Sequence, residues 1–530
     1  MFKLRKSHYI LLFMAIIFFV AYVWFIWPQN AGLGLQPRFD WPDETANYFW
    51  INHLVQTNQL TLSQPLNLIA QNQIHPRSSN VLDNGSLVPG SFLGLILFYG
   101  VLAKIIGLKL IFLLPPLFSV LAVLAFFGIV KKIFDERVAL ISACLMFMHP
   151  VWWYYSSIAW LPNIIFVAFI IFSLYFLLAK EKISWPAIIL SGSFLGLALS
   201  FRPTEIVWLS ILYLAVLVYI FKKLSWQKIL VFVILSGSVI LPSLYFQFKI
   251  FGSIFTSGYS QLQSQANSNC LTCQIIQAIL LPFGFDLKNI LKNVWHYLVF
   301  NFWWLNILAL LGWRQLMVQK NQIQREKVGY LVLGGVISLW LVIYYGSWQF
   351  SDLMTVNLNF LAISYLRYWL PIYIFSLPLV ALGLVWLAEA ASQKFKNFLI
   401  IIFLLIIFVI SADLVIWLKP DSLQPVKARI GTYYQIARQV NEKTEASAII
   451  ITSRKDKVFF PERQVIQTFD ALSQNQELQN KILPLLAYAP AYYYALANEP
   501  VWLGNEILSL EEVLNINGEV LYKINRQGNE

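Results

Sequence analysis

Apolar runs of membrane-spanning length recur along most of this chain, and they constrain its fold more than any other feature. Stretches of roughly 17 to 23 mostly apolar residues return from Tyr9 to Trp417, long enough to cross a bilayer as α-helices. Charged residues make up only 12% of the 530 positions, about half the share usual in a soluble chain. The sequence therefore predicts an all-α polytopic protein, integral to a cell or plasma membrane.

The basic residues are grouped in short clusters between the apolar runs. A net charge of +12 would also suit a nucleic-acid-binding protein, but clusters of this kind are typical of cytoplasmic loops in membrane proteins. We therefore expect membrane lipids, and no nucleic acid, as partners. Cys270 and Cys273, in "NCLTC", are interpreted as a disulfide or as residues without a role, because one CxxC alone is weak support for a metal site.

The basic clusters also set the expected topology. The run from Tyr9 to Trp27 follows three basic residues and is not followed by a small-residue cleavage site, so we interpret it as a retained span with a cytoplasmic N-terminus. The stretch from Pro89 to Ile106 is ambiguous, because as a span it would move every later basic cluster outside, whereas as a helix in the outer interface it keeps them inside. The second reading gives about 11 spans, at 9–27, 110–130, 138–153, 163–179, 184–201, 204–221, 229–246, 294–313, 328–346, 368–388 and 397–417.

Two segments are then expected outside the membrane. Residues 1–418 form the transmembrane domain, whose first outer loop, about 28–109, includes the interfacial helix. Residues 419–530 differ in pattern: "TYYQIARQVNEKT" predicts an amphipathic helix, and "ASAIIIT" and "ERQVIQTF" predict strands. We predict that this segment is a small extracytoplasmic α/β domain.

A cluster of acids follows the first span. The stretch "FDWPDETANYFW", residues 39–50, contains Asp40, Asp43 and Glu44 among aromatic side chains. Acids beside a membrane are often only solvated, but three of them this close repel one another unless a ligand or cation offsets the charge. "WPDET" can also begin a helix at Pro42 or Asp43, which would hold the carboxylates just above the bilayer.

Two arginines lie at the outer ends of expected spans. Arg202, in "LSFRPTEIVW", precedes Glu205, and Arg367, in "AISYLRYWLPIY", precedes Tyr368. Either arginine could be an interfacial anchor. The alternative is a phosphate ligand, because a planar guanidinium offers two parallel hydrogen bonds to phosphate oxygens.

Six segments follow one another along the chain: "PDETANY", "LVPGSFLGLILFYG", "KKIFDERVAL", "MHPVWWYYSSIAWLPNIIF", "LSFRPTEIVWL" and "YLRYWLPIY". In this order they resemble the GT-C class of membrane glycosyltransferases, in the branch with protein O-mannosyltransferases and the lipid A aminoarabinose transferase (glycosyltransferase family 39-like). The resemblance covers about residues 1–390.

The resemblance implies an inverting transfer of a hexosyl or pentosyl group from a polyprenyl-phosphate donor to a hydroxyl of an extracytoplasmic glycan, lipid or protein. It implies Asp43 as the general base, with Glu44 or Asp40 supporting it or holding a divalent cation. Arg202 and Arg367 are then the candidates for the donor phosphate, with Glu205 and Tyr368 as their neighbours in the substrate site.

The chain departs from its relatives at one position of the expected site. Many relatives have a second acid where this sequence has Asn163, in "WLPNI". An amide can hydrogen-bond a sugar, but it is neither a general base nor a strong metal ligand. His53 and His75 lie in the first loop and could be ligands together with the acids, but single histidines in a polar loop are usually solvated. We therefore assign no metal ligand, and a divalent cation near Asp43 and Glu44 stays open.

Two other classes of function stay open at this point. A transporter or flippase of a lipid-linked or small polar substrate would place ionisable groups near the bilayer centre and would often contain inverted repeats. The ionisable groups here lie at the outer edge, and no convincing repeat is found. A non-catalytic scaffold that presents 419–530 would require that segment and would not require the carboxylates.

Overall fold

The computed structural model describes residues 6–28, 34–179, 181–259, 281–318, 324–349, 361–389, 395–468, 470–497, 499–501 and 508–527. The chain forms two compact units, each built from separated segments. The helical unit comprises Met1–Ile26, Phe112–Pro242 and Gln265–Pro425, and the mixed unit comprises Trp27–Ile111, Ser243–Ser264 and Val426–Glu530. Each unit is described by itself.

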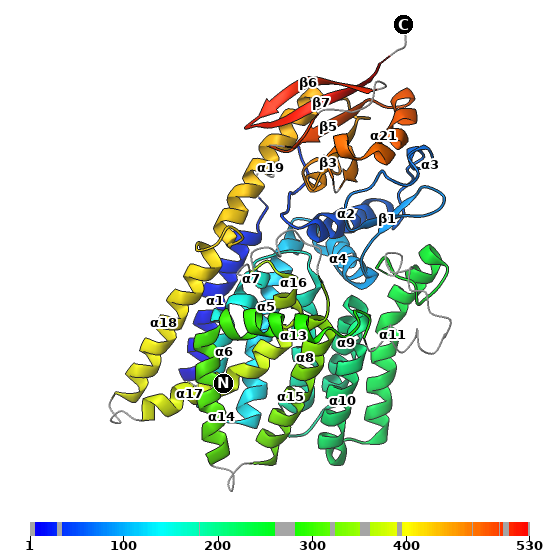
Figure 1. Ribbon diagram of the computed structural model, residues 1–530. Coiled ribbons are helices and arrows are strands. Elements are labelled where there is room, and N and C mark those ends of the chain that lie inside the picture. Colours follow the sequence, from blue (N-terminus) through cyan, green and yellow to red (C-terminus); the bar gives the residue numbers. More distant parts are fainter. Residues whose placement is uncertain are drawn as a thin grey trace. The chain divides into compact units, whose positions relative to one another are not determined.

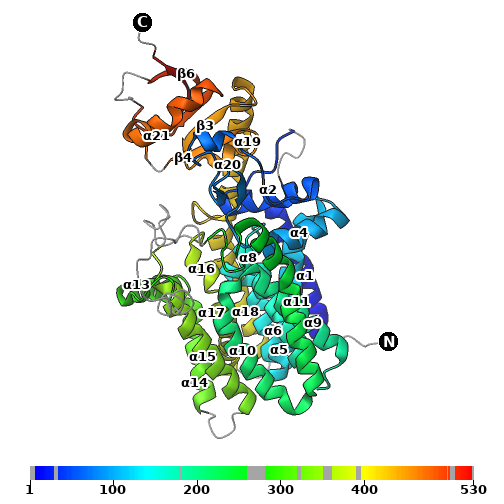
Figure 2. The same ribbon diagram turned by 90° about the vertical axis from the view of Figure 1, so that its right-hand side faces the viewer.

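Long helices make up most of the helical unit, and they run alongside one another in both views (Figures 1 and 2). Its α-helices are α1 (Lys6–Ile26), α5 (Leu114–Ile133), α6 (Glu136–Met148), α7 (Pro150–Ser156), α8 (Pro162–Leu178), α9 (Trp185–Phe201), α10 (Ile206–Ile220), α11 (Trp226–Phe251), α13 (Leu287–Asn293), α14 (Trp303–Val318), α15 (Arg325–Gly346), α16 (Ser364–Tyr368), α17 (Leu370–Glu389) and α18 (Lys396–Ile416). Single turns η1 (Leu110–Leu113), η2 (Pro203–Glu205) and η3 (Phe221–Lys223) and the π-helical segment η5 (Val294–Phe300) adjoin them.

The helices account for the predicted spans. Among the described residues, seven helices are long and apolar enough to cross a membrane, or up to nine if each of two bent helix pairs is one span. The other two predicted spans are α8 and α9, apolar helices of 17 residues each. The chain is therefore an integral membrane protein with a helical transmembrane part.

Two predicted spans are bent and not straight. The helices α6 and α7 meet at 56°, where Pro150 begins α7, and the segment 287–300 meets α14 at 86°. A proline lacks the amide hydrogen that would continue the α6 hydrogen-bond ladder, which explains the first bend. The predicted span 294–313 is thus a helix that turns nearly at right angles, and apolar periodicity does not report such a turn.

Close packing in the helical unit depends on small residues. A Cβ on Gly312 of α14 would lie 2.0 Å from the carbonyl oxygen of Leu379, and one on Gly383 of α17 would lie 2.0 Å from that of Leu308. The two backbones are therefore in direct contact, as is usual where membrane helices associate through small residues.

Every strand found among the described residues belongs to the mixed unit. Its elements are α2 (Pro42–Thr57), α3 (Leu66–Ile69), β1 (Ser79–Val81), β2 (Leu87–Pro89), α4 (Leu93–Ile106), α19 (Leu423–Lys443), β3 (Ile449–Ser453), α20 (Asp456–Phe459), β4 (Gln464–Thr468), η8 (Leu472–Gln474), α21 (Gln476–Ile482), η9 (Leu483–Ala487), β5 (Ala491–Ala495), β6 (Leu508–Ile516) and β7 (Glu519–Arg526). The five-stranded sheet has the order β4-β3-β5-β7-β6, with β3 parallel to β4 and β5, and β7 antiparallel to β5 and β6.

The first loop and the C-terminal segment share one hydrophobic core in this unit. On one face of β3, Ile449 and Ile451 pack with Ala70 and Ile74 from the first loop, and Ile450 faces α19 on the other side. The α/β character expected for 419–530 is present, but the core of the sheet is completed by residues of the loop 27–111.

The ambiguous stretch Pro89–Ile106 is short in the structure. Its helix, α4, has 14 residues and belongs to the mixed unit. At 1.5 Å per residue it is about 21 Å long, and its 14 residues are fewer than the roughly 17 to 25 that a membrane-spanning helix needs, a range that α8 and α9 just reach. Its length agrees with the expected interfacial helix and not with a span.

Candidate functional site

Arg202 of the helical unit is buried next to an acid. It follows the last residue of α9, and Pro203 then begins a tight turn that places Glu205 on the same side. Its Nη2 lies 2.7 Å from Glu205 Oε1, its Nε donates to the same oxygen at 2.9 Å, and its Nη2 donates to the Tyr345 hydroxyl at 2.8 Å. The arginine is only 7% exposed, and the carboxylate supplies the opposite charge that a buried cation requires.

Glu205 is held from several directions. Trp208 Nε1 donates to Oε2 at 2.6 Å, and the Tyr345 hydroxyl donates to Oε1. These bonds satisfy both oxygens of a buried carboxylate, as buried charges require. The carboxylate is therefore part of a fixed network.

Tyr368 connects the two predicted arginines. The Cζ of Arg202 lies 4.5 Å from the centre of its ring, and the Cζ of Arg367 lies 5.2 Å from it. The ring of Tyr345 stacks on that of Tyr368, with 4.5 Å between centres. Cations at these distances are attracted to the ring face, so the aromatic pair holds both guanidinium groups near one place.

Asn163 fixes the backbone of the same cluster. It lies in the first turn of α8, and its Nδ2 donates to the carbonyl oxygen of Arg367 at 3.3 Å. Its buried Oδ1 has no hydrogen-bond partner among the described residues. The structure thus brings Asn163, Arg202, Glu205, Arg367 and Tyr368 together, in the helical unit, from three separate parts of the chain.

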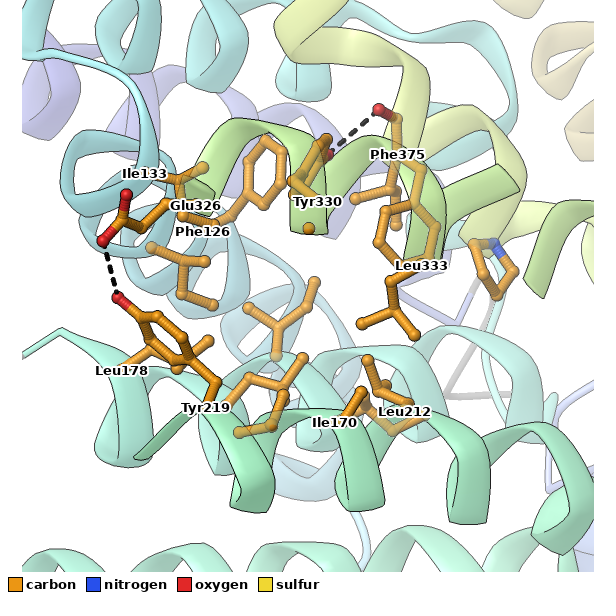
Figure 3. Close-up of a pocket in the computed structure, with 18 of the residues that line it drawn as sticks. Phe126, Ile133, Ile170, Leu178, Leu212, Tyr219, Glu326, Tyr330, Leu333 and Phe375 are labelled. Atoms are coloured by element: carbon orange, nitrogen blue, oxygen red, sulfur yellow. Dashed lines mark hydrogen bonds between the residues drawn. The ribbon is translucent and has the colours of Figure 1, made fainter. Parts of the chain in front are cut away.

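An apolar cavity of about 230 Å³ lies between α5, α8, α10, α15 and α17 (Figure 3). Its walls are mostly aliphatic and aromatic, and its few hydroxyls are engaged: Tyr219 donates to Glu326 at 3.3 Å and Tyr330 to the carbonyl oxygen of Phe375 at 3.0 Å. Trp208, which bonds Glu205, is also a lining residue. A hydrocarbon chain would fit such walls, and the cavity reaches Trp208, which donates to the carboxylate paired with Arg202.

The predicted catalytic acids begin a helix in the mixed unit. Pro42 is the first residue of α2, and Asp43 and Glu44 lie in its first turn, where carboxylates interact favourably with the helix dipole. Asp43 Oδ1 accepts a hydrogen bond from Ser78 Oγ at 2.5 Å, and Glu44 is buried. The helix expected from "WPDET" is confirmed.

Asp40 is engaged by cations of the C-terminal segment. Arg429 donates to its two oxygens from Nε at 2.9 Å and Nη2 at 2.6 Å, Tyr433 donates at 3.1 Å, and Lys457 Nζ lies 3.4 Å away. Burial alone would raise the pKa of Asp40, but the charges of Lys457 and Arg429 outweigh it and hold that pKa well below its usual value. Asp40 thus joins the first loop to α19 and α20 within the mixed unit.

The described residues were also compared with the side-chain clusters that bind metal ions. Among those residues, no group of three or more His, Cys, Asp or Glu side chains could hold a metal ion. His53 Nε2 lies 3.1 Å from the carbonyl oxygen of Thr61, and His75 Nδ1 lies 3.0 Å from that of Pro76. Cys270 and Cys273 lie outside the described residues.

Several contributing residues could not be identified from sequence. Tyr345 and Ser78 are single hydroxyls without a motif. Arg429 and Lys457 contact Asp40, which lies 389 and 417 positions earlier in the chain, respectively. The available signal was the unexplained cluster of acids, which indicated that a ligand or a cation had to offset their charge.

Comparison with known proteins identifies the fold. The sequence profile of the family described as dolichyl-phosphate-mannose-protein mannosyltransferase matches residues 97–246. No curated protein sequence matches the chain. The crystal structure of ArnT from Cupriavidus metallidurans in the apo state is similar, with 12% identity and a TM-score of 0.53 over 96% of this chain and 97% of that chain.

Two further structures give the same result. ArnT from Cupriavidus metallidurans bound to undecaprenyl phosphate has 12% identity and a TM-score of 0.51 over 96% of this chain and 97% of that one. The apo oligosaccharyltransferase of Archaeoglobus fulgidus has 12% identity and a TM-score of 0.51 over 91% of this chain and 69% of that one. The chain has the fold of the GT-C glycosyltransferases, so the resemblance found in the sequence is confirmed at the level of the fold.

Proposed function

We propose that this protein is a glycosyltransferase that moves a sugar from a polyprenyl-phosphate donor to an acceptor hydroxyl on the extracytoplasmic side of a membrane. The observation that carries the proposal is the buried cluster in which Tyr368 contacts both Arg202 and Arg367, adjoining an apolar cavity. A lipid phosphate has the matching chemistry, since it combines an anionic head with a hydrocarbon chain. The GT-C fold and the partial family match support the same class of reaction.

The proposed reaction is a single displacement with inversion at the anomeric carbon. The acceptor oxygen bonds to that carbon as the bond between the carbon and the phosphate oxygen breaks, and the lipid phosphate leaves with the electron pair. The acceptor proton passes to the Asp43 carboxylate, and Glu44 supports that carboxylate. General-base catalysis of this kind contributes about 10²- to 10⁴-fold in rate.

The two arginines hold the donor phosphate in this proposal. Negative charge grows on the departing phosphate, and a fixed cation there is among the strongest contributions to catalysis. Arg202 is paired with Glu205, so it orients the phosphate chiefly through directed hydrogen bonds. We assign stabilisation of the growing charge to both guanidinium groups, and we assign the apolar cavity to the isoprenoid chain.

The test is a transfer assay with the full-length protein in proteoliposomes. Polyprenyl-phosphate-linked hexoses and pentoses are supplied as donors, envelope material as the acceptor, and release of polyprenyl phosphate is measured. Asp43→Asn should lower the rate by about two orders of magnitude or more, while Asp83→Asn, an exposed acid of the same loop, should not. Full activity of Asp43→Asn would remove that residue as the base, and transport of the donor without transfer would favour a flippase.

A further inference from the structure

A single helical turn of the C-terminal segment contacts the first loop at two places. In α20, the neighbouring residues Asp456 and Lys457 point to different parts of that loop. Asp456 accepts from Arg77 through Nε and the backbone amide, each at 2.8 Å, and lies 2.6 Å from its Nη2. Lys457 bonds the carbonyl oxygen of Asp40 and lies 3.4 Å from its carboxylate.

Both contact points are connected to Asp43, one through the backbone and one through a hydrogen bond. Asp40 comes three residues earlier in the chain, just before α2 begins. Arg77 directly precedes Ser78, whose hydroxyl donates to Asp43 Oδ1 at 2.5 Å. A displacement of α20 would therefore be transmitted to Asp43 both through its own backbone and through the hydroxyl that holds its carboxylate.

The position of Ser78 is strongly restricted. Its backbone has φ of 61°, in the left-handed region that non-glycine residues seldom adopt. Its carbonyl oxygen accepts from the amide of Gly90 at 3.1 Å, and a Cβ on Gly90 would come within 2.7 Å of that carbonyl group. The serine is thus held by the ion pair of Arg77 before it and by a backbone contact that only glycine permits.

Burial makes the two connections stiff. The side chain of Asp456 is 1% exposed and that of Lys457 is 12% exposed. Charge-assisted hydrogen bonds in such surroundings are short and directional, so they fix geometry more firmly than exposed pairs do. The bond from Ser78 fixes rotation of the Asp43 carboxylate about its Cβ–Cγ bond, which gives both oxygens a defined direction.

We propose that α20 is a positioning element for the general base. Through Asp456, Arg77 and Ser78 it sets the orientation of the Asp43 carboxylate, and through Lys457 and Asp40 it sets the start of the helix that carries it. This inference rests on the proposed function, because it takes Asp43 as the base. It gives the C-terminal segment a role in catalysis that does not depend on recognising an acceptor.

The test uses kcat and the donor KM of the full-length protein in proteoliposomes. Ser78→Gly removes the hydroxyl while glycine accepts the left-handed backbone, and Asp456→Asn breaks the ion pair with Arg77. Both should lower kcat about 10- to 100-fold, as expected when a reacting group is misplaced by about 1 Å, and should leave the donor KM unchanged. Ser78→Gly should also leave the thermal midpoint unchanged, whereas Asp456→Asn, which removes one partner of a buried ion pair, should lower it. The control is Glu477→Gln, which breaks the ion pair with Lys481 inside α21, away from α20.

The outcomes separate this inference from the proposed function. If Asp43→Asn abolishes transfer while Ser78→Gly and Asp456→Asn keep the wild-type kcat, the positioning role is wrong and the function stands. A loss of activity in Ser78→Gly that comes with a higher donor KM and a lower thermal midpoint indicates a merely structural role and also overturns it. If Asp43→Asn itself retains full activity, the assignment of the base fails and the inference fails with it.

Discussion

Replacing Asp40 with asparagine should loosen the mixed unit, by an amount that the structure allows us to work out. The carboxylate accepts two bonds from Arg429 and one from Tyr433, and it lies beside Lys457. An asparagine has nearly the same shape but carries no charge. The substitution would therefore leave two cations facing each other in a partly buried site without their anion.

The expected loss is about 3 kcal/mol in the free energy of opening this part of the unit. Removing one partner of a buried ion pair costs about 3 to 5 kcal/mol. The lower end of this energy range applies because the Arg429 side chain is 32% exposed and can turn toward water. The Lys457 side chain is only 12% exposed and cannot do so easily. At 1.4 kcal/mol per factor of ten, this corresponds to about a 100-fold change in the opening equilibrium.

Hydrogen exchange of the full-length protein in lipid nanodiscs measures that equilibrium directly. Under conditions where exchange reports the opening equilibrium, amides of α2 and α20 should exchange about 100-fold faster in Asp40→Asn than in the wild type. The control is again Asp83→Asn. A second variant, Asp40→Asn with Lys457→Met, should recover part of the protection because one unpaired cation is removed.

The pH dependence gives the same argument a second test. Because the pKa of Asp40 is lower in the folded protein than in the unfolded chain, its contribution is complete above the unfolded value, about 3.9, and is lost as the pH falls toward the folded value. The difference in protection between the wild type and Asp40→Asn should therefore be constant from pH 8 to about pH 5 and should shrink below about pH 4. Equal exchange in Asp40→Asn and Asp83→Asn at pH 7 would refute the reasoning.

Three further substitutions have expected outcomes. Gly90→Ala should lower kcat at least tenfold, with the donor KM unchanged, because the added Cβ would collide with the carbonyl group of Ser78. Glu205→Gln should lower the thermal midpoint, because the neighbouring guanidinium loses its carboxylate, yet added polyprenyl phosphate should raise that midpoint more than in the wild type. Val216→Trp, which fills the apolar cavity, should raise the KM of long-chain donors but not of a short-chain analogue, and the exposed Leu214→Trp on the same helix should change neither.

The membrane spans were predictable because the bilayer imposes a simple rule on sequence. Backbone groups in hydrocarbon must be satisfied within a helix, so each crossing needs a long apolar run that is visible in one dimension. The same rule explains what could not be foreseen. The 86° turn before α14 alters direction without altering composition, and the sequence 294–313 therefore reads as one straight span.

Residues of the candidate site could be predicted only where a charged residue lies at the end of an apolar run. Arg202 and Arg367 are charged residues at the ends of apolar runs, which makes each conspicuous, but nothing in their local sequence indicates that Tyr368 contacts both. The partners of Asp40 are even harder to predict from the sequence, because Arg429 lies in an ordinary amphipathic helix, where an arginine is common. Long-range pairing of this kind is decided by the tertiary fold and leaves no local pattern.

The shared core of the mixed unit changes how the role of residues 419–530 can be tested. Deleting that segment was expected to distinguish a scaffold from an enzyme. However, the segment supplies the sheet on which Ala70 and Ile74 of the first loop pack, and it supplies the cations that engage Asp40. Its removal would expose the apolar residues of the loop that carries Asp43, so activity would be lost whether the protein is a scaffold or an enzyme. Only substitutions that leave this core intact, such as Ser78→Gly, can separate a role in positioning the base from a role in presenting a surface.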